Sequence, residues 1–225
     1  SRTLTGANLA MAIVGGVAFS EFFLLTLYLQ DVLHYSAIQS GVAFTGFALA
    51  VVVVSNVAQV IVTRVGVRPT LTAGLLMSAL SVAWLTRLPI EGHYFWDLFP
   101  AFVLGGAGMG LSFVPVTIAS LTGVERADAG VASGLINTSR QMGGAMALAA
   151  ISAVAATSSG NFADAHGVAA SSAAALDHGF QTALYALTGL LALGALIAVT
   201  LVRSAPAPEA SAAPEPERLA LEEAA

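Results

Sequence analysis

The sequence predicts an all-α membrane protein in which six transmembrane helices form one bundle. Hydrophobic residues make up 57% of the chain and charged residues 9%, whereas a soluble protein carries roughly 25% charged residues. Six apolar stretches approach or exceed the about 20 residues that a helix needs to cross a bilayer. Their length and uniformly apolar character exclude the alternating strands of a barrel. The stretches cover residues 5–30, 40–63, 69–88, 98–121, 129–156 and 180–202.

Sequence signals mark each stretch in turn. The first begins within a few residues of Ser1, and the second ends just before Arg64. Pro69 opens the third, because proline fits the first turn of a helix. Pro115 is expected to bend the fourth. The fifth carries a polar cluster near its middle, and the sixth ends just before Arg203.

The arginines predict the orientation of these spans. All eight basic residues are arginine, and five of them fall on one side of a six-span topology. By the positive-inside rule that side is cytoplasmic. We therefore predict a multi-pass protein of the plasma membrane in which both ends of this segment lie in the cytoplasm. The five arginines are Arg2, Arg64, Arg68, Arg126 and Arg203.

The regions outside the spans are predicted to be irregular. Residues 157–179 are rich in alanine, serine and glycine and are expected to form a mobile outer loop. Residues 205–225 are expected to be a disordered, acidic cytoplasmic tail, which leaves residues 1–204 as the bundle. Because the chain enters a span almost at once, we expect it to be part of a longer polypeptide.

Two charged residues inside spans are the sharpest functional candidates, since a charge in the membrane is expensive and marks function by default. Glu21 lies within the first span, where desolvation would favour the protonated form that proton coupling requires. Arg140 lies within the fifth span beside Asn137 and Gln141, a cluster that can line a cavity. A structural role remains the alternative for both: Glu21 as a snorkelling polar residue, and Arg140 as a partner of carbonyls or an acid.

Uncharged polar groups extend this list of proton-coupling or cavity candidates. Asn56 lies in the second span and Gln30 at the outer end of the first. Each could equally hold neighbouring helices together by hydrogen bonds worth about 1 kcal/mol or less.

The turn between the second and third spans is a candidate cytoplasmic gate. Arg64 and Arg68 flank Gly66, which can adopt backbone angles closed to other residues. Either arginine could bind a carboxylate or a helix C-terminus in one state and release it in another. The alternative is a turn that only maintains the topology.

Glycines within the spans predict close helix packing. Gly106 and Gly110 are four residues apart, as are Gly130 and Gly134, which is the small-xxx-small spacing of tight contacts in lipid. Such faces suit either a static bundle or helices that slide between two packings.

Several chemistries are not expected. The chain has no cysteine and no H-E-x-x-H pair, so no metal site is predicted, and no catalytic constellation or cofactor site is found. Without lysine it has no phosphate-binding loop for ATP, and the glycine run 105–110 lacks the last glycine of a dinucleotide motif. No nucleic-acid partner is expected.

Several motifs together resemble the later spans of the fourteen-span drug:proton antiporters of the EmrB/QacA type, within the major facilitator superfamily. Thr45-Gly46 departs from this pattern, because relatives often carry leucine and proline there. The pattern does not assign Glu21 a role, so its proton-coupling hypothesis rests on its place in the span. The motifs are Tyr28-Leu29-Gln30, Tyr35-Ser36-Ala37, the Arg64 to Pro69 turn, Gly108 to Pro115, Ala129 to Thr138 and Arg140 to Gly144.

This resemblance implies the C-terminal six-helix half of such an exporter. Its expected activity is proton-coupled efflux of drugs or small metabolites by alternating access, and its expected partners are a small-molecule substrate, protons, the lipid bilayer and an N-terminal transmembrane half. Two alternatives stay open: a non-transporting membrane scaffold, and a half-transporter that forms a homodimer.

Overall fold

The computed structural model describes residues 2–87, 93–121 and 124–202, and these residues form helices and short connections without a strand. The all-α prediction is confirmed. Two π-helical segments, η1 (Tyr28–Val32) and η2 (Tyr94–Leu98), and one 3₁₀ segment, η3 (Arg126–Asp128), lie between α-helices. The α-helices are α1 (Arg2–Leu27), α2 (Ala37–Ala43), α3 (Thr45–Val65), α4 (Val67–Leu85), α5 (Phe99–Leu121), α6 (Ala129–His166) and α7 (Ala173–Leu201).

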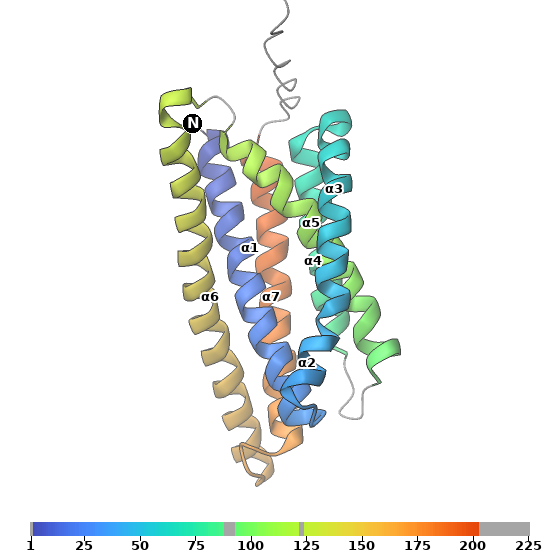
Figure 1. Ribbon diagram of the computed structural model, residues 1–225. Helices are drawn as coiled ribbons and strands as arrows, with labels where there is room; N and C mark the ends of the chain where they lie inside the picture. Colours follow the sequence, from blue (N-terminus) through green and yellow to red (C-terminus); the bar gives the residue numbers. More distant parts are fainter. Residues whose placement is uncertain (1, 88–92, 122–123, 203–225) are drawn as a thin grey trace, which may run out of the picture.

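Five helical stretches of the described chain are long and apolar enough to cross a membrane. They contain α1, α2 with α3, α5, α6 and α7. The remaining predicted span is α4, a 19-residue helix that carries Arg68 near its start and is not among the five. It nevertheless packs along α5 and α7 within the same bundle (Figure 1).

The helices pack around one shared hydrophobic core. Helix α1 packs against α6, α7 and α5, while α4 lies between α5 and α7. Helices α3 and α6 occupy the two flanks of the bundle (Figure 1). Of the five apolar spans, those that contain these two helices are the least covered by the rest of the protein. In the most apolar 18-residue part of each span, 17% of the span with α3 and 22% of the span with α6 is buried, compared with 61% of the span with α1.

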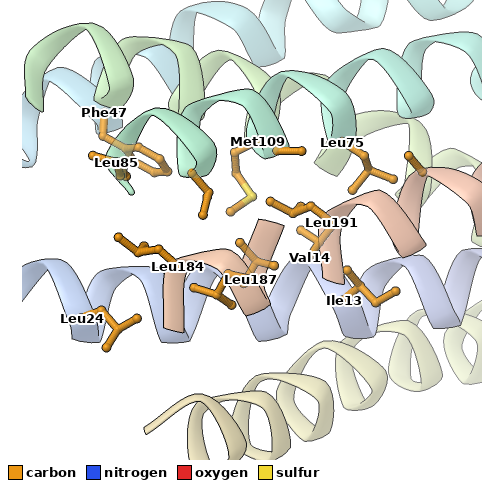
Figure 2. Packing of buried hydrophobic residues seen from close by; sticks show 14 of the residues in the cluster. Ile13, Val14, Leu24, Phe47, Leu75, Leu85, Met109, Leu184, Leu187 and Leu191 are labelled. Carbon is orange, nitrogen blue, oxygen red and sulfur yellow. The ribbon is translucent and has the colours of Figure 1, made fainter. Parts of the chain in front are cut away.

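The core lies where α1, α4, α5 and α7 meet. Figure 2 shows side chains from these helices pointing toward one another, among them Val14 of α1, Leu75 of α4, Met109 of α5 and Leu187 of α7. Each of the four is at most 8% exposed. Lipid is as apolar as these side chains, so the association of the helices depends on packing contacts and on small residues that let backbones approach.

The first span and the second are joined by a short, hydrogen-bonded connection. Helix α1 passes into the π-helix η1, and His34 then takes a positive φ of 55°. Ser36 caps α2: its hydroxyl accepts from the Gln39 N–H at 3.3 Å, and the Gln39 side chain accepts from the Ser36 N–H at 2.8 Å. This capping box satisfies donors that a helix start leaves free, and Phe44 separates α2 from α3.

The predicted mobile loop at 157–179 is wrong. Helix α6 continues to His166 and α7 begins at Ala173, so the connection is much shorter. Alanine is the strongest helix former, and the serines and glycines in this stretch do not stop the helix. Contacts with α7 also hold the extension in place: Ser158 and Thr182 share a hydrogen bond of 2.9 Å, and Phe162 stacks on His178.

One end of the bundle contains the α3–α4 turn with Arg64 and Arg68, and we call it the basic end. The start of α1 and the end of α7 lie there too (Figure 1). The predicted acidic tail at 205–225 and Arg203 lie outside the described residues.

Candidate functional site

A glycine seam joins α1 and α6 and positions the polar cluster of α6. A Cβ on Gly143 would come within 2.6 Å of the backbone of Ala12, and a Cβ on Gly16 within 2.7 Å of the Ala147 side chain. The two helices can therefore approach this closely only because these positions lack a side chain. Next to the seam, the Ser139 hydroxyl donates to the Asn8 side-chain carbonyl at 2.8 Å.

The seam places Arg140 at the middle of the bundle. The Arg140 carbonyl oxygen and side-chain Cγ lie against Gly15. Gly15 is 11 residues from the start and 17 residues from the end of the span Leu4–Val32, or about 16 and 25 Å along the helix. The Arg140 guanidinium donates to the Asn137 side-chain carbonyl at 3.0 Å. No carboxylate in the described part of the chain lies within salt-bridge distance of it.

Gln141 lies beside this pair. It is exposed, as is Asn137. Arg140 itself is half-buried. The structure therefore brings Arg140, Asn137 and Gln141 together on one stretch of one helix.

Glu21 faces another direction. Its side chain is 5% exposed, and it shares a face of α1 with buried Val14 and Val17, which are seven and four residues away. Phe19, two residues before Glu21, faces α6, because its ring lies against Gly144. Two residues are about 200° apart on a helix, so Glu21 points into the half-bundle and away from Arg140. Beside it, the buried Ser20 hydroxyl has no hydrogen-bond partner among the described residues.

The remaining polar candidates are not brought to this cluster. Asn56 lies exposed on α3, on the opposite flank from α6 (Figure 1), and donates to the Val52 carbonyl of its own helix at 2.8 Å. Gln30 lies exposed in η1, near the end of the bundle opposite the basic end.

The candidate gate is a one-residue turn. Gly66 alone separates α3 from α4, with φ 96° and ψ 167°, a region that residues with a Cβ rarely enter. Its N–H donates to the Val62 carbonyl at 2.9 Å, and its carbonyl accepts from the Thr70 hydroxyl at 2.8 Å. Arg64 is exposed and Arg68 half-buried, and neither has a carboxylate partner within the described ranges.

The two predicted glycine pairs differ in their surroundings. A Cβ on Gly106 would lie 2.8 Å from the Ala50 side chain, and one on Gly110 would lie 3.0 Å from the Ser55 nitrogen, so both face α3 closely. Around Gly130 and Gly134 nothing lies within 4 Å of such a Cβ. These two glycines therefore make no close helix contact within the described chain. Pro115 lies inside α5 and is buried.

Some contacts between helices were not predicted from the sequence. The Ser81 hydroxyl donates to the Ala101 carbonyl at 2.7 Å, joining α4 to α5. The Tyr94 hydroxyl donates to the Ala43 carbonyl at 2.7 Å. A serine or a tyrosine in an apolar stretch gives no sign of its partner. The capping box at Ser36 and Gln39, by contrast, has a readable S-x-x-Q signature.

An open groove of about 420 Å³ also follows the α1–α6 seam. Asn8 and Ser139 contribute polar atoms to it, and Met142 and Met146 line its rim. Arg140 does not line this groove. Within the described residues no group of three or more histidine, aspartate or glutamate side chains is placed to hold a metal ion.

Comparison with known proteins gives a family match over most of the bundle. Residues 3–148 match the family model described as the Major Facilitator Superfamily. This segment contains α1 to α5 and the part of α6 that carries Arg140.

Individual relatives are named as resistance or export proteins. The chain is 33% identical to the puromycin resistance protein of Streptomyces alboniger over 192 residues, which is 83% of this chain and 38% of that protein. It is 38% identical to the cephamycin export protein of Amycolatopsis lactamdurans over 145 residues, which is 64% of this chain and 30% of that protein. The matched segments thus span 38% and 30% of these two relatives, well under half of either protein.

Proposed function

Because the chain is a multi-pass membrane protein that belongs to the Major Facilitator Superfamily, we propose that it is the C-terminal six-helix half of an exporter for drugs or small metabolites. The observation that carries this proposal is the family match over residues 3–148. The names of the relatives support export as the direction of transport. Since the matched segment spans 38% or less of those relatives, the partner in this proposal is an N-terminal transmembrane half.

The uncovered faces of α3 and α6 support a cavity between the two halves. Exposed side chains on α3 are mostly apolar, such as Val53 and Val57, and lipid or protein can cover them. The exposed Asn137 and Gln141 on α6 need a protein partner or water, because polar groups in hydrocarbon are costly. The substrate cavity in this proposal lies against α6, and rocking of the two halves gives alternating access.

Glu21 is the proposed proton-coupling residue of this half. It is a buried carboxyl group within the first span, and such groups in membrane proteins serve proton relays and ion pathways. Its position inside the half-bundle allows proton binding to change the packing of α1 against its neighbours. In the proposed orientation both ends of the segment lie in the cytoplasm of a plasma-membrane protein, and Arg64 and Arg68 form the cytoplasmic gate around Gly66.

Proton coupling is testable in proteoliposomes that contain the complete gene product carrying this chain. A pH gradient is imposed, and the uptake of radiolabelled puromycin and of a cephamycin, the compounds named for two relatives, is measured. We expect accumulation of at least one compound that a protonophore abolishes. Glu21→Gln should reduce this accumulation to the level of protein-free vesicles, because an amide cannot exchange the coupled proton.

The matched control is Asp31→Asn, which makes the same chemical change at an exposed position at the end of the first span. It should retain wild-type uptake. Wild-type uptake in Glu21→Gln vesicles would remove Glu21 from the mechanism. Absence of any gradient-driven uptake would favour the scaffold, and uptake by the isolated six-helix chain would favour the homodimeric half-transporter.

A further inference from the structure

Arg140 carries a positive charge at mid-membrane depth with most of its hydrogen-bonding capacity unused. A guanidinium has five N–H donors, and in the described chain one hydrogen bond, to Asn137, is found for it. Its backbone lies against Gly15, near the middle of the first span. Lipid head groups lie at the ends of the spans, so an anion that pairs with Arg140 has to come from within the membrane region.

No acid among the described residues is placed to be that anion. Asp31 and Asp97 lie in η1 and η2, beyond the end of α1 and before the start of α5. Glu125 and Asp128 precede α6, and Asp128 is 12 residues before Arg140, about 18 Å along the helix. Helices α3, α4 and α5 contain no aspartate or glutamate. Glu21 of α1 lies on the face turned away from α6. Asp164 of α6 is 24 residues beyond Arg140, about 36 Å along the helix. Asp177 is at the start of α7, near the end of the bundle opposite the basic end, and is hydrogen-bonded to Gln181 at 2.8 Å.

The groups around Arg140 are suited to an anion. Asn137 accepts from Arg140 with its carbonyl oxygen, which leaves its NH₂ group as a donor. The exposed Gln141 offers a second NH₂ group one residue further on. A carboxylate accepts bidentate hydrogen bonds from a guanidinium and can take further donors on its remaining lone pairs.

An aromatic surface lies on the same face of α1 as the Arg140 contact. Gly15, Ala18 and Phe22 share this face because they are three and seven residues apart. Phe22 is 39% exposed and lies 4.8 Å from Phe44 between ring centroids. Phe44 in turn stacks on Phe102 at 5.3 Å. Gly15 and Phe22 are about 10 Å apart along the helix, which is the length of a two-ring organic molecule.

We infer that Arg140, Asn137 and Gln141 bind the carboxylate of an amphipathic organic anion whose aromatic part contacts Phe22 and Phe44. This inference rests on the proposed function, because it names the substrate class for that exporter. The charge selects the anion, and the phenylalanine rings supply the apolar contact. Asn137 and Gln141 fix the orientation of the carboxylate between them.

The test compares an acid with its uncharged amide. The complete gene product is purified, and binding of 2-naphthylacetate and 2-naphthylacetamide is measured by isothermal titration without any gradient. The wild type should bind the acid about 10- to 100-fold more tightly than the amide, the range for hydrogen bonds to a charged group. Arg140→Gln should abolish this preference, and Arg140→Lys should keep part of it, because an ammonium retains the charge without the planar fork.

Arg87→Gln is the charge-matched control, because Arg87 is exposed and follows α4, whose main packing partners are α5 and α7 and do not include α6. It should keep the full preference. The inference is overturned if the wild type binds the acid no more tightly than the amide, or if a monodisperse Arg140→Gln protein keeps the preference. Because the binding test needs no gradient, it can fail separately from the transport test. An Arg140-dependent preference for the acid, without gradient-driven uptake in proteoliposomes, would refute the proposed export alone. Gradient-driven uptake without that preference would refute the anion site alone.

Discussion

At the scale of single residues, glycine determines how closely α1 and α6 approach. Gly143→Ala adds a Cβ within 2.6 Å of the Ala12 backbone, where no flexible side chain can move aside. Overpacking of this kind costs about 1–3 kcal/mol, so the midpoint of thermal unfolding in detergent should fall. The measurement is fluorescence-detected size exclusion of the complete gene product after heating.

Gly160→Ala provides the comparison within the same helix. Nothing lies within 4 Å of a Cβ at Gly160, and alanine is the better helix former, so its midpoint should stay unchanged or rise. Equal losses at Gly143 and Gly160 would contradict the tight α1–α6 seam.

The residue scale is also where prediction from sequence was least complete. Spacing identified Gly106 with Gly110 and Gly130 with Gly134 as equivalent pairs, yet only the first pair faces another helix of the described chain closely. Spacing tells which residues share a face of a helix, whereas the neighbour of that face depends on long-range packing. For the same reason the sequence identified Glu21 and Arg140 as charges within spans but could not show that they point in different directions.

At the scale of elements, the end of α6 is the clearest departure from expectation. Its final segment, residues 158–166, contacts α7 through the Ser158–Thr182 hydrogen bond and the stacking of Phe162 on His178. The composition of this stretch suits an exposed loop, but composition does not reveal a partner helix that stabilises it. Short signals with a local mechanism, such as the glycine turn at Gly66, are predictable because they need no distant contact.

Hydrogen exchange measured by mass spectrometry distinguishes the helix from the loop. Amides of residues 157–163 should exchange much more slowly than those of residues 167–172, because the first group is hydrogen-bonded within α6. Ser158→Ala removes one contact with α7 and should raise exchange in 157–163 while leaving the middle of α6 protected. Equal, fast exchange across 157–172 would restore the mobile loop.

At the scale of the whole molecule, the uneven covering of the helices carries the main functional argument. Both α3 and α6 expose most of their length and carry exposed polar side chains, Asn56 on α3 and Asn137 with Gln141 on α6, but α6 also holds the charge of Arg140 beside them. The order of the spans and the all-α class follow from hydrophobic patterning, so they were predictable. Which helices lie on the flanks was not, because patterning in a membrane protein does not distinguish a face toward lipid from a face toward protein.

The two kinds of exposed face should differ in their contact with water. The chain has no cysteine, so single cysteines can be introduced in a clean background. In the complete gene product, Asn137→Cys should react with a negatively charged methanethiosulfonate reagent, because the proposed cavity admits water and Arg140 attracts the reagent. Leu80→Cys on α4 is the control: Leu80 is 62% exposed within this chain, yet it should remain unreactive because it faces lipid. Slow reaction at both positions would mean that α6 packs against protein or lipid without a cavity, and would place the substrate path elsewhere.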